Sequence, residues 1–314
     1  MPFSNTAFTI TQEQLKTPTK KTALITGGSS GIGLHTAILL HSLGNNIVLI
    51  DRQPPSTTAP EPSKAPQSLL SSSRFLFHRA DITSWVEQRA GFEAAIKKFG
   101  KIDLVYVNAG IAEYGDQFFK EELEPSTKLL KEPDRRVIDI DLQAADDTVR
   151  LAIHYLRRNG KDTGGSIVMT ASLAGYLASA GAPLYSAAKH GVVGLMRALK
   201  NDTATLGIAC SVVAPAITLT PIISGRKEGQ SLQDWAEKMR AQGVPINSPE
   251  EIARAVVWLF GQGMGGNGKG LLVQAGKVAD LEAGIAKTRG QWMGEEMLAL
   301  FRGGRQAPLF PNKL

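Results

Sequence analysis

A glycine-rich turn near the N-terminus constrains the fold most. The short apolar run Thr22–Thr26 leads into Thr-Gly-Gly-Ser-Ser-Gly-Ile-Gly at 26–33, and a helical pattern follows through Leu43. A second apolar run, Ile47–Ile50, closes on Asp51. A strand, a glycine-rich turn, a helix and a second strand within about 30 residues make a βαβ unit. The sequence therefore predicts a parallel sheet whose first turn can bind an anionic ligand.

The residues of this turn suit a pyrophosphate. Glycines let the backbone approach the phosphates closely, and the helix N-terminus supplies free N–H groups with a partial positive charge. Asp51 can accept both hydroxyls of an adenosine ribose and would repel a 2′-phosphate, which favours NAD. Arg52 can pair with that phosphate instead, so NADP remains possible.

Strand and helix patterns alternate along the rest of the chain. Apolar runs predict five further strands, at 74–78, 103–107, 165–170, 208–213 and 270–273. Helical periodicity predicts long helices, at 85–99, 134–158 and 184–206. This alternation favours an α/β fold with a single Rossmann-type, doubly wound parallel sheet of about seven strands, covered by helices on both faces.

We expect three regions: a loose N-terminal arm, a dinucleotide-binding catalytic domain and a C-terminal extension, at 1–20, 21–276 and 277–314. Within the domain, the Pro- and Ser-rich stretch 53–73 predicts an exposed loop. The stretch 216–248, rich in glycine and proline around a short helix, predicts a substrate lid. The extension has an amphipathic pattern at 292–301, and packing on its own domain is favoured over a subunit or membrane contact.

Composition excludes several classes of function. Of the 314 residues, 43% are hydrophobic and 20% charged, enough for a full core. The net charge of +6 comes without a Lys/Arg run, so an anionic cofactor explains it better than nucleic acid. The single Cys210 excludes a cysteine metal site, and the pair Asp146 and Asp147 is typical of a solvated helix face, so we predict no metal. The absence of a signal segment or an apolar run near ~18 residues predicts a cytoplasmic protein without membrane insertion.

A tyrosine and a lysine in one helix are candidates for acid–base chemistry. Tyr185 and Lys189 are four residues apart, so their side chains lie on one face of the helix. A lysine ammonium favours the phenolate and lowers the pKa of a phenol from about 10 toward neutrality. The spacing alone is common among helices. It gains weight because Asp81, Asn108–Gly110 and Ser172 also fall at expected strand ends, where parallel sheets bind ligands.

Together these motifs resemble the short-chain dehydrogenase/reductase family over roughly residues 20–276. The resemblance rests on Thr-Gly-x-x-x-Gly-x-Gly from Thr26, Asn-Ala-Gly from Asn108, Ser172 thirteen residues before Tyr185, and Tyr-x-x-x-Lys. Within the family the chain is most similar to fungal members akin to 15-hydroxyprostaglandin dehydrogenases.

The resemblance implies a role for each matching position. Tyr185 would exchange the substrate hydroxyl proton, Lys189 would lower the tyrosine pKa and hold the nicotinamide ribose, and Ser172 would hydrogen-bond the reacting oxygen. The implied cofactor-binding residues are Gly27, Ser29, Ser30, Gly31, Ile32, Gly33, Asp51, Arg52, Asp81, Ile82, Asn108, Ala109, Gly110, Tyr185, Lys189, Thr218 and Thr220.

Two positions depart from the family pattern. The family's Val-Asn-Leu in the long helix is Ile140-Asp141-Leu142 here. In the family the main-chain carbonyl of that asparagine helps hold a water on the lysine, and Asp141 can still do this. Its charge can also perturb Lys189, so Asp141 joins the catalytic candidates. The family's Pro-Gly is Pro215-Ala216, and since alanine does not take a positive φ cheaply, the local turn is expected to differ.

The leading hypothesis is an NAD(P)-dependent oxidoreductase that interconverts a secondary alcohol and a ketone on a small-to-medium, partly apolar substrate. Lid residues Ile217, Leu219, Ile222 and Ile223 would supply an apolar lining. Two alternatives are a relative that catalyses isomerisation or cyclisation, and a dinucleotide sensor without turnover. By resemblance we also expect a homodimer or homotetramer in which the two longest helices pair across a two-fold axis.

Overall fold

The computed structural model describes residues 6–15, 20–223 and 230–304, and one eight-stranded sheet forms its centre. The strand order is β3-β2-β1-β4-β5-β6-β7-β8, parallel except for β8, which is antiparallel to β7. The strands are β1 (Thr22–Thr26), β2 (Asn46–Asp51), β3 (Phe75–Arg79), β4 (Leu104–Val107), β5 (Gly165–Thr170), β6 (Ile208–Pro215), β7 (Gly270–Gln274) and β8 (Lys277–Asp280). The predicted Rossmann-type fold is confirmed, and the sheet has one strand more than the seven expected.

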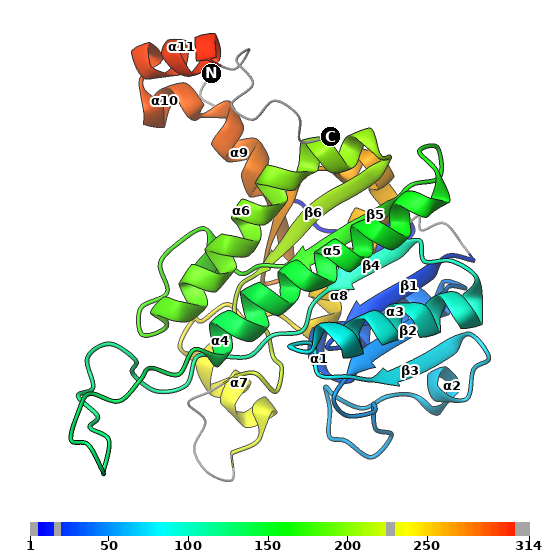
Figure 1. Cartoon of the computed structure of the whole chain (residues 1–314), viewed down its shortest axis with the longest axis horizontal. Helices are drawn as coiled ribbons and strands as arrows, with labels where there is room; N and C mark the ends of the chain where they lie inside the picture. Colours follow the sequence, from blue (N-terminus) through cyan, green and yellow to red (C-terminus); the bar gives the residue numbers. More distant parts are fainter. Residues whose placement is uncertain (1–5, 16–19, 224–229, 305–314) are drawn as a thin grey trace.

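Helices cover both faces of this sheet (Figure 1). One face packs against α3 (Trp85–Phe99), α5 (Ala144–Leu156) and α6 (Pro183–Thr205). The other packs against α1 (Gly31–Ser42) and α8 (Pro249–Gln262). The shorter helices are α2 (Gln67–Leu70), α4 (Arg136–Ile138), α7 (Leu232–Ala241), α9 (Leu281–Lys287), α10 (Arg289–Met293) and α11 (Glu295–Gly304). None of the helices in the described part of the chain has the length and hydropathy of a transmembrane span.

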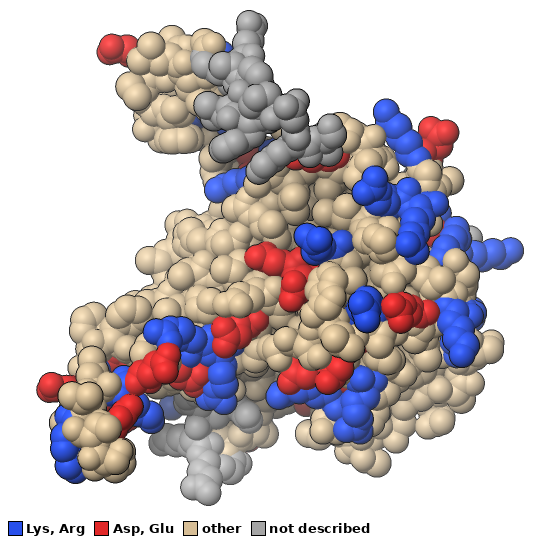
Figure 2. Space-filling view, viewed as in Figure 1, with Lys and Arg blue, Asp and Glu red and all other residues tan. Residues whose placement is uncertain are grey.

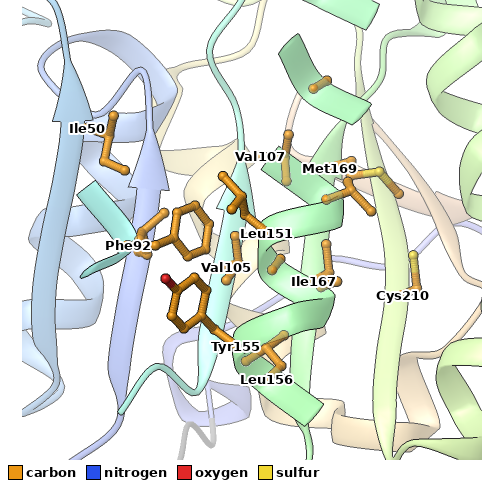
Figure 3. Close-up of a cluster of buried hydrophobic side chains, with 14 of the residues drawn as sticks. Ile50, Phe92, Val105, Val107, Leu151, Tyr155, Leu156, Ile167, Met169 and Cys210 are labelled. Atoms are coloured by element: carbon orange, nitrogen blue, oxygen red, sulfur yellow. The ribbon is translucent and has the colours of Figure 1, made fainter. Parts of the chain in front are cut away.

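The central strands are apolar on both faces because helices bury both. Every residue of β1 is buried, as the short continuous apolar run predicts. On the α3 side, Figure 3 shows the rings of Phe92 and Tyr155 facing each other beside Val105. Their centroids lie 5.4 Å apart with a 20° angle between the ring planes. This aromatic pair joins α3 and α5 to the sheet.

Residues 6–15 of the predicted N-terminal arm pack against the sheet, whereas a loose arm was expected there; residues 1–5 and 16–19 lie outside the described residues. Phe8 and Val278 of β8 exchange main-chain hydrogen bonds of 2.9 and 2.8 Å. The Phe8 ring lies 5.7 Å from that of Trp258 in α8, and Ile10 and Leu15 are buried. A loose arm was expected because the composition of this stretch is mostly polar, which gave no sign of these apolar contacts.

The described part of the C-terminal segment, residues 277–304, begins with a strand of the sheet and continues into helices that lie outside the body of the molecule. β8 lies beyond Gly276, where the sequence placed the end of the domain. Arg197 of α6 pairs with Glu282 of α9 at 2.7 Å, which anchors that helix. Helices α10 and α11 then project away (Figure 1), with Trp292 and Met297 exposed. The expected packing of the extension on its own domain therefore applies to β8 and α9. It does not apply to the exposed faces of α10 and α11.

The predicted helix over 134–158 contains an irregular turn. A π-helical stretch, Asp139–Gln143, separates α4 from α5. The loop before it, 112–135, forms an arm that extends from the body in Figure 1. Figure 2 shows acidic and basic side chains side by side along this arm. Single π turns often mark functional positions, because the extra residue redirects side chains.

The loop over 53–73 ends in a packed helical turn. Ala65 and Leu69 are buried against the apolar core on the α1 side, and His35 of α1 contacts the carbonyl oxygen of Pro62 at 2.7 Å. This loop replaces the helix that usually connects two parallel strands.

Replacing Phe92 with alanine is expected to lower the free energy of unfolding by about 3–5 kcal/mol, since it empties a buried site stacked on Tyr155. Val86 of the same helix is 62% exposed, so Val86→Ala should change it by no more than about 0.5 kcal/mol. Urea unfolding followed by circular dichroism measures both. Equal effects of the two substitutions would contradict the packing described.

Candidate active site

One cavity of about 930 Å³ opens at the carboxyl ends of the parallel strands. It lies where the strand order reverses between β1 and β4, the place where such sheets bind ligands. All but two of the predicted site residues line it: Gly27, Ser30, Gly31, Ile32, Asp51, Arg52, Asp81, Ile82, Asn108, Ala109, Gly110, Asp141, Ser172, Tyr185, Lys189, Thr218 and Thr220. Residues distant in the sequence are thus brought together around a single space.

The glycine-rich turn adopts a shape that side chains would prevent. Gly27 has φ +64°, and a Cβ there would lie 2.7 Å from the Cα atom of Ala109. Gly33, which is not part of the cavity lining, packs so tightly that a Cβ would lie 2.3 Å from the Gly27 carbonyl oxygen. Ser30 precedes α1 without a side-chain capping bond. The N-terminus of α1 therefore faces the cavity with main-chain donors suited to phosphate oxygens.

Asn108, which follows β4, forms hydrogen bonds with residues at the ends of β1 and β5. Its Nδ2 atom donates to the carbonyl oxygens of Thr26 and Gly27, both at 3.1 Å. Its main-chain N–H donates to Thr26 Oγ1 at 3.0 Å, and its Oδ1 atom lies 3.2 Å from Thr170 Oγ1. The amide thus fixes the position of the glycine-rich turn relative to β4 and β5.

The acidic residue at the end of β2 sits beside the same turn. The Ser29 main-chain N–H donates to Asp51 Oδ2 at 3.0 Å. Ser29 Oγ is buried and has no hydrogen-bond partner in the described part of the chain, and Ser29 is the other predicted residue that does not line the cavity. The turn, the helix N-terminus and this carboxylate fit a dinucleotide with its pyrophosphate at α1 and its adenosine ribose at Asp51.

Hydrogen bonds orient the residues at the predicted adenine end. Asp81 Oδ1 accepts from the Thr83 main-chain N–H at 2.9 Å and from its hydroxyl at 2.8 Å. These bonds, with a smaller contribution from the charge of Arg52, hold the pKa of Asp81 below its usual range. Gln88 donates to the carbonyl oxygen of Ile82 and fixes the other residue of the pair.

Tyr185 and Lys189 lie on one face of α6, as their spacing predicts. The Lys189 Nζ atom is 5.5 Å from the centroid of the Tyr185 ring and donates to the Thr170 carbonyl oxygen at 3.0 Å. It also lies 3.0 Å from Asp141 Oδ2. Burial alone would lower the pKa of the Lys189 ammonium. The charges of Asp141 and Tyr185, together with the hydrogen bond to Asp141, outweigh burial and hold that pKa above its ordinary value. Lys189 is therefore a charged group beside the tyrosine.

Two further contacts position the catalytic candidates. The main-chain N–H of Tyr185 donates to Glu113 Oε2 at 2.9 Å, which places a carboxylate at the first turn of α6. Ser172 Oγ accepts from the Ala174 main-chain N–H at 3.1 Å. Sequence reasoning missed Glu113, because no motif surrounds it. It also missed the Thr170 carbonyl, because a main-chain contact carries no side-chain signal.

Residues of the stretch 216–248, which was expected to be a substrate lid, supply part of the apolar lining. Ile217, Ile222 and Ile223 line the cavity as predicted, whereas Leu219 is buried in a separate cluster with Ala236 of α7. The apolar wall of the cavity also includes Ile111, Tyr114, Leu173, Trp235 and Pro245. Residues 224–229 of the predicted lid lie outside the described residues.

The turn after β6 shows how alanine replaces the expected glycine. The Ala216 main-chain N–H donates to the Val273 carbonyl oxygen at 3.0 Å, so pairing with β7 continues past Pro215. Ala216 is not among the described residues with positive φ. The backbone therefore stays in a region that alanine adopts freely.

Comparison with known proteins identifies the family of this chain. A family model for short chain dehydrogenases matches residues 21–231. The chain belongs to the short-chain dehydrogenase family. It is therefore an NAD(P)-dependent oxidoreductase that acts on CH–OH or C=O groups.

Several relatives resemble this short-chain dehydrogenase over most of its length. The short-chain dehydrogenase/reductase prx4 of Penicillium rubens is 36% identical over 257 residues, which cover 81% of this chain and 69% of the relative. The 3-hydroxyacyl-CoA dehydrogenase type-2 of Bos taurus is 33% identical, over 74% of this chain and 86% of that protein. The structure of 3-ketoacyl-(acyl-carrier-protein) reductase from Brucella melitensis, complexed with NADH, matches with a TM-score of 0.66 and 26% identity, over 82% and 98% of the two chains.

Gly33→Ala is expected to weaken dinucleotide binding by about tenfold or more, because the added methyl group must displace the backbone of the phosphate-binding turn. Gly194 on α6 is the control, since a Cβ there meets nothing within 4 Å. Gly194→Ala should leave binding unchanged and stabilise the protein by about 0.5–1 kcal/mol. Calorimetric titration with NADH measures binding. Unchanged affinity in Gly33→Ala would contradict the tight packing of this turn.

Proposed function

We propose that this short-chain dehydrogenase interconverts a secondary alcohol and a ketone, with NAD as its preferred dinucleotide. The observation that carries the proposal is the Tyr185–Lys189 pair, which shares one cavity with Ser172 and with the glycine-rich turn. A proton-exchanging phenol and a dinucleotide-binding turn around one space are the two parts that alcohol oxidation requires.

Each catalytic candidate has a separate role in the proposed reaction. Tyr185 takes the proton of the substrate hydroxyl during oxidation and returns it during reduction. Ser172 donates a hydrogen bond to the reacting oxygen, and its own position is fixed by the Ala174 N–H. Lys189 stabilises the ionised phenol by its charge. The nicotinamide, when bound, supplies the chemistry of hydride transfer.

Asp51 supports a preference for NAD. Its carboxylate is held beside the phosphate-binding turn by the Ser29 N–H, so the phosphate group of NADP would lie close to a negative charge. Arg52 is the residue that can oppose this preference. Its charge acts on Asp81, which gives the guanidinium an acidic neighbour within the protein.

The apolar wall supports a partly apolar substrate of small to medium size. Tyr114, Ile217 and Ile222 are among the large apolar side chains with high exposure, and all three line this cavity. Exposed apolar side chains that converge on a cavity bind apolar ligands, since binding removes their surfaces from water.

Three narrower expectations remain part of the proposal. A similarity to fungal members akin to 15-hydroxyprostaglandin dehydrogenases is the narrower placement within the family. A homodimer or homotetramer is expected from the resemblance to the family. A cytoplasmic location remains a prediction from the sequence.

NADH is expected to bind more tightly than NADPH in calorimetric titrations of the purified protein. Asp51→Ala should weaken NADH binding by about tenfold, because it removes charge-assisted hydrogen bonds to the ribose, and should narrow the difference between the two cofactors. Tighter binding of NADPH would assign cofactor selection to Arg52 instead. Absence of binding to both would reject the dinucleotide site.

Tyr185→Phe is expected to reduce turnover by about 10²-fold or more, because it removes the group that exchanges the proton. The measurement follows NADH formation with a panel of cyclic and aryl-alkyl secondary alcohols. NADH binding by the variant is the control for an intact site. Hydride transfer that survives unaltered would reject the mechanism, and binding without turnover by the unchanged protein would favour a dinucleotide sensor.

A further inference from the structure

A buried acidic residue contacts the catalytic lysine directly. Asp141 is 1% exposed and Lys189 is 3% exposed, and their Oδ2 and Nζ atoms lie 3.0 Å apart. Asp141 belongs to the π-helical turn before α5, whereas Lys189 belongs to α6. The ion pair therefore joins two elements, and both of its residues line the cavity.

The Asp141 carboxylate also holds the cofactor-binding segment after β4. Its Oδ1 atom accepts from the Ile111 main-chain N–H at 2.8 Å. A Cβ on Gly110 would lie 2.7 Å from Oδ2, so the carboxylate packs directly against the main chain of this segment. One side chain thus contacts both the lysine and the Asn-Ala-Gly motif.

The charged and polar groups around the pair come from several elements. Asp141 faces Lys189 from the π-helical turn, and the Thr170 carbonyl faces it from β5. Glu113, in the loop after β4, lies at the Tyr185 N–H. On α6 itself, His190 is exposed and contacts the Ser186 carbonyl oxygen instead. Asp141 is therefore the charged side chain that directly offsets Lys189 in the described structure.

We propose that Asp141 is a positioning residue that fixes Lys189 beside Tyr185 and limits how strongly its charge stabilises the ionised tyrosine. The inference rests on the proposed roles of Tyr185 and Lys189. Two opposite charges 3.0 Å apart act at a distance as a dipole, so the phenol experiences less positive potential than from a lysine alone. A neutral side chain at position 141 removes this opposing charge, so the phenol experiences the full positive potential of Lys189 for as long as the lysine stays protonated.

The tyrosines of this chain allow a direct test without substrate or cofactor. Of five tyrosines, Tyr106, Tyr155 and Tyr176 have pKa values raised by burial, which moves their ionisation to high pH. Tyr114 is exposed. In a Tyr114→Phe background, the tyrosinate absorbance that develops at lower pH reports Tyr185, and the Tyr114→Phe/Tyr185→Phe protein supplies the baseline.

Asp141→Asn in this background is expected to lower the titration midpoint of Tyr185 by about one pH unit. Asparagine has the same shape, and its oxygen can still accept from the Ile111 N–H, so the change keeps that hydrogen bond while it removes the negative charge and the acceptor that face Lys189. An unchanged midpoint would overturn the proposal. A higher midpoint would also overturn it, because Asp141 would then act by keeping Lys189 protonated.

A second variant guards against loss of fold. If circular dichroism shows that Asp141→Asn does not fold, Asp141→Ser is titrated in the same way, and the midpoint of Tyr185 is again expected to fall. Failure of both variants to fold would overturn the proposal, since the pair would then serve stability alone. NADH binding to the unchanged protein is measured separately. A lowered midpoint without NADH binding would reject the proposed function and leave the coupling of Asp141 to Tyr185 intact.

Discussion

Parallel pairing of β1 with both β2 and β4 is the constraint on which the site depends. Because the chain leaves β1 toward one neighbour and later returns to the other, the loops after β1 and β4 diverge and open a cavity between them. Asn108 then spans the gap from β4 to the glycine-rich turn. The catalytic candidates on α6 face a space whose shape is set by strand order.

Much of the fold could be predicted because its parallel core leaves a strong sequence signal. Strands such as β1 and β6 are buried throughout, so they appear as continuous apolar runs. β8 escaped prediction because it has only four residues, of which Val278 alone is buried. The π-helical turn was also missed, since one inserted residue scarcely changes the helical spacing of the apolar positions around it.

Some residues of the candidate site could also be predicted from the sequence, and others could not. Motif residues such as Ser172 and Tyr185 could be found because their chemistry needs particular side chains at particular spacings. Glu113 and the Thr170 carbonyl could not, since they act by capping a helix and by a main-chain contact. Leu219 shows a further limit. Its apolar character was consistent with the cavity lining, but alternation along the chain turned it toward α7 instead.

The hydrogen bonds between Phe8 and Val278 have a consequence for solubility. An antiparallel strand at the end of a sheet exposes unpaired main-chain groups that can recruit a strand from another molecule. Here the N-terminal segment occupies part of that edge, and the Phe8 ring is placed against Trp258. A short apolar segment that precedes the first strand thus shields the last strand from intermolecular β-pairing, and a protein shortened at this end would be more prone to aggregate.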